Sequence, residues 1–244
     1  NVTGYSFTPG SAYRWGQFVA FDPTGTLMKI DGFEPVENQN LHGMEVPDML
    51  IITIKDFIPQ AERIAKLHKD VEGLDVAVVD QQQVFNEFSS GTPDAMAYRL
   101  LCKMLYDRNS KFKNLLLLGG GSYDNRGIIS NRPNRLITYQ SDASNDYLQS
   151  YTSDDFFGFL DDNSGLNHDK DVLRLGVGRI TCSSPSEAEA DVDKIAKYIL
   201  APDYGHWRNS QLIVGDSGDE NIHAVQAEGI WTVPAAAAAE ASAL

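Results

Sequence analysis

Cysteine is scarce in this chain of 244 residues, which contains only Cys102 and Cys182. Two cysteines allow at most one disulfide, so a fold stapled by several disulfides is excluded. Basic residues are also few, with 20 Lys and Arg against 34 Asp and Glu, and the formal net charge is -14. This balance argues against a nucleic-acid partner, because phosphate binding depends on Lys and Arg. No apolar run reaches the roughly 18 residues of a membrane-spanning helix.

The motifs of several enzyme classes are missing as well. Glycines 119–121 follow an apolar run, but no Lys-Ser or Lys-Thr comes after them, so a tight turn is expected rather than a phosphate-binding loop. The chain has no Gly-x-Ser-x-Gly elbow, and its five histidines lack paired zinc-ligand spacing. Cys102 falls on the apolar face of a predicted helix and is expected in the core, whereas Cys182, at a strand end, could be exposed. The residues alone give no convincing catalytic centre.

The two ends of the chain differ from its middle in composition. Residues 1–47 lack helical periodicity and are interrupted by Gly and Pro, which predicts a β-rich segment followed by a linker. The chain starts at Asn1 without a Met, so we expect a processed or excised piece. Residues 231–244 are dominated by alanine and lack an apolar stripe, so this tail is left out of the functional interpretation.

Residues 48–230 alternate between short apolar runs and helical patterns. Strands are predicted at 49–54, 74–79, 115–118, 172–178 and 211–215, and helices at 57–69, 93–108 and 186–200. Strands that alternate with helices at this spacing indicate a parallel sheet with helices packed on it. We therefore expect an α/β fold with one mostly parallel sheet and helices on both faces.

Aspartates crowd the predicted loop between the third and fourth strands, and two of them, Asp154 and Asp155, are adjacent. Calcium prefers oxygen ligands of this kind, so these carboxylates are a candidate calcium site of irregular geometry. The alternative is a solvated acidic loop. Because loops after the carboxyl ends of parallel strands gather at one edge of the sheet, we expect the loop 138–162 and the strand end 216–219 to lie at the same edge.

Several short motifs occur together in one order along the chain. They are Pro47–Thr53, Phe85–Thr92, Leu116–Asn125, Ser153–Gly158, Gly176–Arg179 and Gly205–Asn209. This series resembles the gingipain-type cysteine peptidases, and within them the sortase-like peptidases of the type IX secretion system. The resemblance covers about residues 37–229.

The resemblance implies a caspase-like catalytic domain in a secreted hydrolase at the cell surface, the outer membrane or the extracellular space. It implies cleavage of C-terminal sorting signals by a Cys nucleophile with a His general base. Protein substrates with such signals and outer-membrane secretion components would then be its partners. The family places the His in a Gly-His-Gly turn and the Cys in an Ala-x-Cys segment, and this chain contains neither. It therefore resembles the N-terminal subdomain of that catalytic domain. Asp216 is similar to a family position that supplies an acidic partner to the His.

Two other functions fit the sequence and stay open at this point. The first is a non-catalytic pseudo-peptidase scaffold that docks partners in a secretion assembly. The second is a calcium-stabilised adhesion module, which would use the acidic loop around Asp154. The Gly-His-Gly and Ala-x-Cys motifs, if encoded downstream of residue 230, would distinguish a peptidase from a scaffold.

Overall fold

The computed structural model separates two compact units, 1–40 and 41–244. It describes residues 21–26, 29–129, 134–143, 145–146, 148–165, 170–201, 204–210, 212–213, 215–216 and 218–230.

The β-rich segment expected over 1–47 is not formed in its described part. No strand occurs in 21–26 or 29–47, where the one helical turn is η1 (Leu41–Gly43). The side chains of Ile30 and Phe33 are 87% and 95% exposed. A lone extended segment gains little because a strand is stabilised by its neighbours. Residues 1–20 and the alanine-rich tail 231–244 lie outside the described residues.

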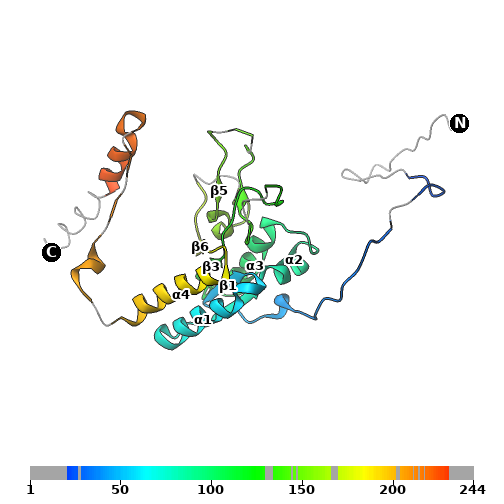
Figure 1. Ribbon diagram of the computed structural model, residues 1–244, viewed down its shortest axis with the longest axis horizontal. Coiled ribbons are helices and arrows are strands. Elements are labelled where there is room, and N and C mark those ends of the chain that lie inside the picture. Colours follow the sequence, from blue (N-terminus) through cyan, green and yellow to red (C-terminus); the bar gives the residue numbers. More distant parts are fainter. Residues whose placement is uncertain are drawn as a thin grey trace. The chain divides into compact units, whose positions relative to one another are not determined.

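The second unit is built on a four-stranded parallel sheet (Figure 1). Its strands are β1 (Met49–Thr53), β2 (Val76–Asp80), β3 (Asn114–Leu118) and β6 (Gly176–Ile180), in the order β2-β1-β3-β6. The parallel sheet is therefore confirmed, and β1, β2 and β3 lie within two residues of their predicted positions. The fourth strand is later than predicted, because Gly176 rather than Val172 pairs with the start of β3.

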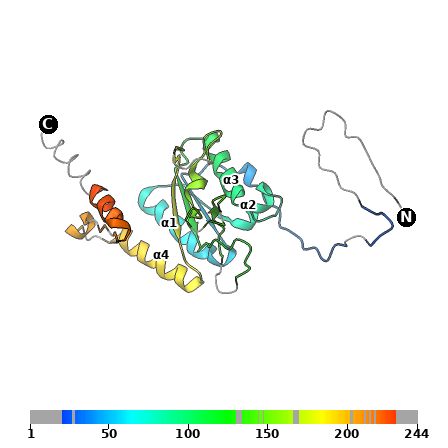
Figure 2. The same cartoon turned by 90° about the horizontal axis from the view of Figure 1, so that it is seen from above.

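Helices cover both faces of the sheet, as the sequence predicts (Figure 2). On one face lie α1 (Ile58–Glu72) and α4 (Pro185–Leu200), and on the other lie α2 (Gln81–Phe88) and α3 (Ala95–Arg108). Strand β1 shows the alternation that creates these two layers: Ile51 joins the α1 and α4 layer, whereas Leu50 joins the α2 and α3 layer. All five residues of β1 are buried, as expected for a central parallel strand.

The predicted fifth strand, 211–215, is wrong in its described part, since residues 212, 213 and 215 are not in a strand. Helix α4 shares the face of α1, because Val192 packs in the same cluster as Ile64. Right-handed connections over one face of a parallel sheet all step in the same direction across the strands. On this face, α1 steps from β1 to β2, which is away from the outer side of β6. A parallel strand beyond β6 would need a left-handed crossover. The described sheet therefore ends at β6.

A small antiparallel hairpin lies in the long connection between β3 and β6. It pairs β4 (Tyr139–Gln140) with β5 (Thr152–Ser153), and η3 (Asp155–Gly158) follows at once. The hairpin gives this connection regular structure where the sequence predicts a loop. Among the residues that the structure describes, no helix is both long enough and apolar enough to cross a membrane.

The chain leaves α4 through a cluster around Arg208, in the short helix η4 (His206–Asn209). The Arg208 guanidinium lies 4.6 Å, 4.9 Å and 5.1 Å from the ring centroids of Tyr198, Tyr204 and Trp207. Its Nη2 also donates to the carbonyl oxygens of Tyr198 and Ala201, at 3.1 Å and 3.2 Å. Arg208 therefore satisfies carbonyl groups that the end of a helix leaves without partners.

Candidate functional site

Three glycines, residues 119–121, follow β3 beside the carboxyl end of β1, and they are called the glycine turn below. The order of the strands reverses between β1 and β3, and in open parallel sheets this is where ligands bind. The hydroxyl of Thr53 donates to the carbonyl oxygen of Leu118 at 2.8 Å. The N–H of Gly120 donates to the carbonyl oxygen of Cys182 at 2.8 Å. The turn is thus held by both neighbouring strand ends.

The glycine turn also packs against the loop before β4 and forms hydrogen bonds with it. The carbonyl oxygen of Gly120 accepts from the N–H groups of Arg135 and Leu136, at 2.8 Å and 3.1 Å. A Cβ at Gly121 would lie 2.5 Å from Cγ2 of Thr138 and 2.8 Å from the carbonyl oxygen of Leu136. Glycine is required here because the two backbones approach each other too closely for a side chain.

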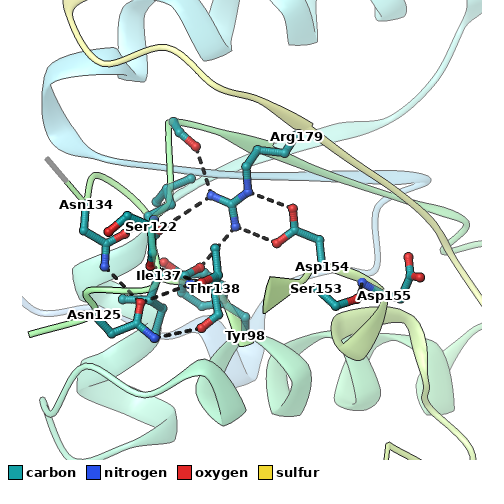
Figure 3. Close-up of polar contacts among 12 residues, drawn as sticks. Tyr98, Ser122, Asn125, Asn134, Ile137, Thr138, Ser153, Asp154, Asp155 and Arg179 are labelled. Atoms are coloured by element: carbon teal, nitrogen blue, oxygen red, sulfur yellow. Dashed lines mark hydrogen bonds and ion pairs between the residues drawn. The ribbon is translucent and has the colours of Figure 1, made fainter. Parts of the chain in front are cut away.

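Arg179 ties these segments together (Figure 3). Its Nε and Nη2 donate to the two carboxylate oxygens of Asp154 at 2.8 Å and 2.7 Å. Nη1 donates to the carbonyl oxygen of Gly119 at 2.9 Å, and Nη2 also donates to that of Ile137 at 3.1 Å. The side chains of Arg179 and Asp154 are only 8% and 25% exposed. One planar guanidinium thereby joins β6, the end of β3, the loop before β4 and the residue that precedes η3.

A buried tyrosine links this edge to the helices beneath it. The hydroxyl of Tyr98, on α3, donates to Oε1 of Gln81 on α2 at 2.7 Å, and Nε2 of Gln81 donates to the carbonyl oxygen of Arg135 at 2.8 Å. Burial raises the pKa of Tyr98 well above its ordinary value, with the nearby Arg179 opposing the shift. Tyr98 therefore acts as a neutral hydrogen-bonding group.

Side-chain amides close the loop that follows the glycine turn (Figure 3). Nδ2 of Asn125 donates to the carbonyl oxygen of Thr138 at 2.9 Å, and Nδ2 of Asn134 donates to Oδ1 of Asn125 at 2.9 Å. The N–H of Ser122 donates to Oδ1 of Asn134 at 3.2 Å. These bonds fasten the start of the loop to the residues before β4 without a backbone ladder. The described part of this edge presents backbone and amide groups, and it contributes neither an exposed thiol nor an imidazole.

Both cysteines lie in the core. Cys102, on α3, is fully buried in the layer of α2 and α3, which confirms the prediction for it. Cys182 is 1% exposed, so the exposure considered for it is wrong. Cys182 belongs to the same core cluster as Ala188 and Val192 of α4, a packing that the local sequence did not indicate. Burial raises the pKa of both thiols, and a protonated thiol is a poor nucleophile.

The predicted site residues differ in what they contact. Asp154 is held by its ion pair with Arg179 at the carboxyl edge, the edge of the sheet where its parallel strands end. Asp155 begins η3, and its N–H donates to the hydroxyl of Ser153 at 3.1 Å. Asp216 is exposed, and its Oδ1 accepts from the N–H of Gly218 at 3.0 Å. No contact described here joins Asp216 to Asp154 or Asp155, so their placement at one edge stays a prediction.

The calcium site predicted at Asp154 and Asp155 is untested, and the bonds of Asp154 argue against it. In the described ranges, no three His, Cys, Asp or Glu side chains gather as metal ligands. Both oxygens of Asp154 already accept from Arg179. We expect a calcium titration to leave the melting temperature unchanged, because calcium would have to displace the guanidinium. A rise in melting temperature that Asp155→Asn removes would instead show that the cation binds at these carboxylates.

The roles of Arg179 and Asn125 were not predicted from the sequence. One signal was present for Arg179, since a single arginine in an otherwise apolar strand needs a partner when the strand is covered. Nothing local marks Asn125, because its partners lie 9 and 13 residues further along the chain.

Comparisons with known proteins agree with the architecture. The chain matches the model of peptidase family C25 over residues 43–241. It is similar to the crystal structure of dimeric latent PorU from Porphyromonas gingivalis, with 39% identity and a TM-score of 0.64. That match covers 76% of this chain and 18% of PorU, so the matched part spans less than a fifth of the length of PorU. A comparison with curated proteins gives no match. The chain belongs to peptidase family C25, the gingipain family of cysteine peptidases.

Proposed function

We propose that residues 48–230 are the N-terminal subdomain of the catalytic domain of a type IX secretion peptidase. The parent protein would cleave C-terminal sorting signals from secreted proteins at the cell surface. The observation that carries this proposal is the family match over residues 43–241, together with 39% identity to PorU. Proteins with C-terminal sorting signals would be its substrates, and outer-membrane components of the secretion system would be its partners.

The described residues would provide part of the substrate cleft, and the catalytic side chains would come from elsewhere in the parent protein. The carboxyl edge, fixed by Arg179, would form one wall of the substrate cleft. The nucleophilic cysteine and the histidine base would come from chain beyond residue 230, in the Ala-x-Cys and Gly-His-Gly segments of the family. Asp216 would orient that histidine by accepting a hydrogen bond from its ring, which keeps the other ring nitrogen available as a base.

The chain alone should show no peptidase turnover on casein or on peptides that carry a sorting signal. Cys102 and Cys182 are buried and have a raised pKa, so neither can attack a substrate carbonyl. The release of peptide fragments can be followed by mass spectrometry. Turnover that Cys102→Ala or Cys182→Ala abolishes would overturn this expectation.

Only an assay of the parent protein, and not of this chain alone, can distinguish a scaffold from a peptidase. A pseudo-peptidase would leave sorting signals intact even with the segment after residue 230 present. The buried core of the sheet serves either function equally well, since it only supports the edge. Cleavage by the parent protein is therefore the experiment that separates the two.

A further inference from the structure

A cavity of about 330 Å³ lies in the loop that follows the glycine turn. Tyr123, Ile128 and Ile129 give it apolar walls, and Arg126 and Gln140 bring polar groups to it. Its volume falls near the lower end of the range for ligand pockets, roughly 300–1,000 Å³. This size suits a few side chains of an extended segment, and it is too small for a folded partner to enter.

The cavity is shaped by a loop whose polar groups are already engaged. A carboxylate oxygen of Asp124 accepts from the N–H of Ile129, and the N–H of Asp124 donates to the hydroxyl of Ser122 at 3.0 Å. The N–H groups of Ile129 and Ile128 lower the pKa of Asp124, so this buried carboxylate is charged and compensated within the loop. Asn125 fastens the same loop to Thr138. These bonds hold the described residues that line the cavity in place.

Gln140 provides a donor without a partner. Its backbone lies in β4 and pairs with Thr152 of β5, so the residue is anchored. Its Nε2 is shut off from solvent and, among the described residues, has no hydrogen-bond acceptor. Buried donors are rarely left unpaired, because a donor that loses its hydrogen bond to bulk water normally gains one to the protein or to an ordered water. Rotation of the side-chain amide could place this donor on the carbonyl oxygen of a bound peptide without breaking an existing bond.

The walls and the charge of the cavity indicate what it binds. Ile128 and Ile129 are 72% and 41% exposed, although they are large apolar side chains. Arg126 is exposed, and no carboxylate of the described chain forms an ion pair with it. Asp124 also lines the cavity, but backbone N–H groups compensate its charge. Among the described residues of the lining, Arg126 is therefore the charge without an ion-pair partner, and it favours an anionic group on the ligand.

We propose that this cavity binds an extended peptide with apolar side chains and a carboxylate at one end. The apolar side chains would contact Tyr123 and Ile128, the peptide carbonyl would accept from Gln140, and the carboxylate would pair with Arg126. The inference rests on the proposed function, since the peptide would be part of a protein substrate that binds away from the cleaved bond.

The test uses this chain and two dye-labelled peptides, acetyl-Ser-Val-Leu-Val-Asp-amide and acetyl-Ser-Val-Leu-Val-Lys-amide, in fluorescence anisotropy titrations. The acidic peptide should bind more tightly than the basic one by about 2- to 5-fold at low salt, as for an exposed ion pair. Arg126→Ala should remove that preference. Gln140→Leu should weaken both peptides by about 2- to 10-fold, the range for one hydrogen bond, and Ile128→Ser should weaken them by a similar factor.

Leu148→Ser is the matched control, because Leu148 is 96% exposed in the same connection and does not line the cavity. It should leave both affinities unchanged. Equal effects of Leu148→Ser and Ile128→Ser would overturn the proposal, as would displacement of the peptides by phosphatidylcholine vesicles, which would indicate a lipid surface. Absence of binding while the parent protein cleaves sorting signals would remove only this inference. Binding by the chain without cleavage by the parent would remove only the proposed function.

Discussion

Arg179→Ala should lower the free energy of unfolding by about 3 kcal/mol or more, the range found when one partner of a buried ion pair is removed. The change leaves the carboxylate of Asp154 without its two donors, in a position where its side chain is 25% exposed. It also removes the donors to the carbonyl oxygens of Gly119 and Ile137. Urea unfolding followed by circular dichroism measures the loss.

Arg174→Ala is the matched control for this variant. Arg174 also forms a two-point ion pair, with Asp161, but the two side chains are 39% and 42% exposed. Solvent screens such pairs and they contribute little to stability. We expect the free energy of unfolding of the control to be close to that of the unsubstituted chain. If both variants lost the same stability, Arg179 would not be the organising contact of the carboxyl edge.

Gly121→Ala should destabilise the chain by about 2 kcal/mol, within the range for overpacking a close contact. The new Cβ would lie 2.5 Å from Cγ2 of Thr138 and 2.8 Å from the carbonyl oxygen of Leu136, so the loop before β4 must move. Thr138→Ser in the same chain should restore part of the loss, because it deletes the methyl group and keeps the hydroxyl that donates to the carbonyl oxygen of Ser122. Thermal and urea unfolding measure both variants.

Gly178→Ala provides the comparison for Gly121→Ala. A Cβ at Gly178 meets nothing within 4 Å, so the substitution should be neutral or slightly stabilising. A loss at Gly178 equal to that at Gly121 would show that the effect is a general cost of alanine for glycine rather than a collision with the loop.

The fold was predictable where local pattern decides it. The apolar runs predicted β1, β2 and β3, and helical spacing predicted α1, α3 and α4. Helix α2 was missed because its first turn is polar, with Gln81 and Gln82 at its start. The sequence did hold a start signal for α2: Asp80 and Gln83 form a capping box, with a side-chain bond in each direction.

The predicted fifth strand failed for a reason that lies beyond local pattern. Its apolar run resembles the others, but its place depends on the face on which α4 packs. The contacts of the candidate site also depend on tertiary structure rather than on local sequence pattern. The segments Ser153–Gly158 and Gly176–Arg179 stand out in the sequence, yet only the fold pairs Asp154 with Arg179 across 25 residues. Residue type alone suggested calcium at Asp154, and it gave no sign of the ion pair with Arg179.

The function that we propose makes this chain part of a cysteine peptidase that cleaves C-terminal sorting signals. Its most direct test uses the parent protein, including the segment after residue 230, and a folded test substrate with a C-terminal sorting signal. Intact-mass spectrometry should show the substrate shortened by its signal. Substituting Ala for the Cys of the downstream Ala-x-Cys segment should abolish this cleavage, whereas Cys102→Ala and Cys182→Ala should leave it intact. A folded parent protein that leaves the signal attached, or that still removes it without the downstream cysteine, would contradict the account.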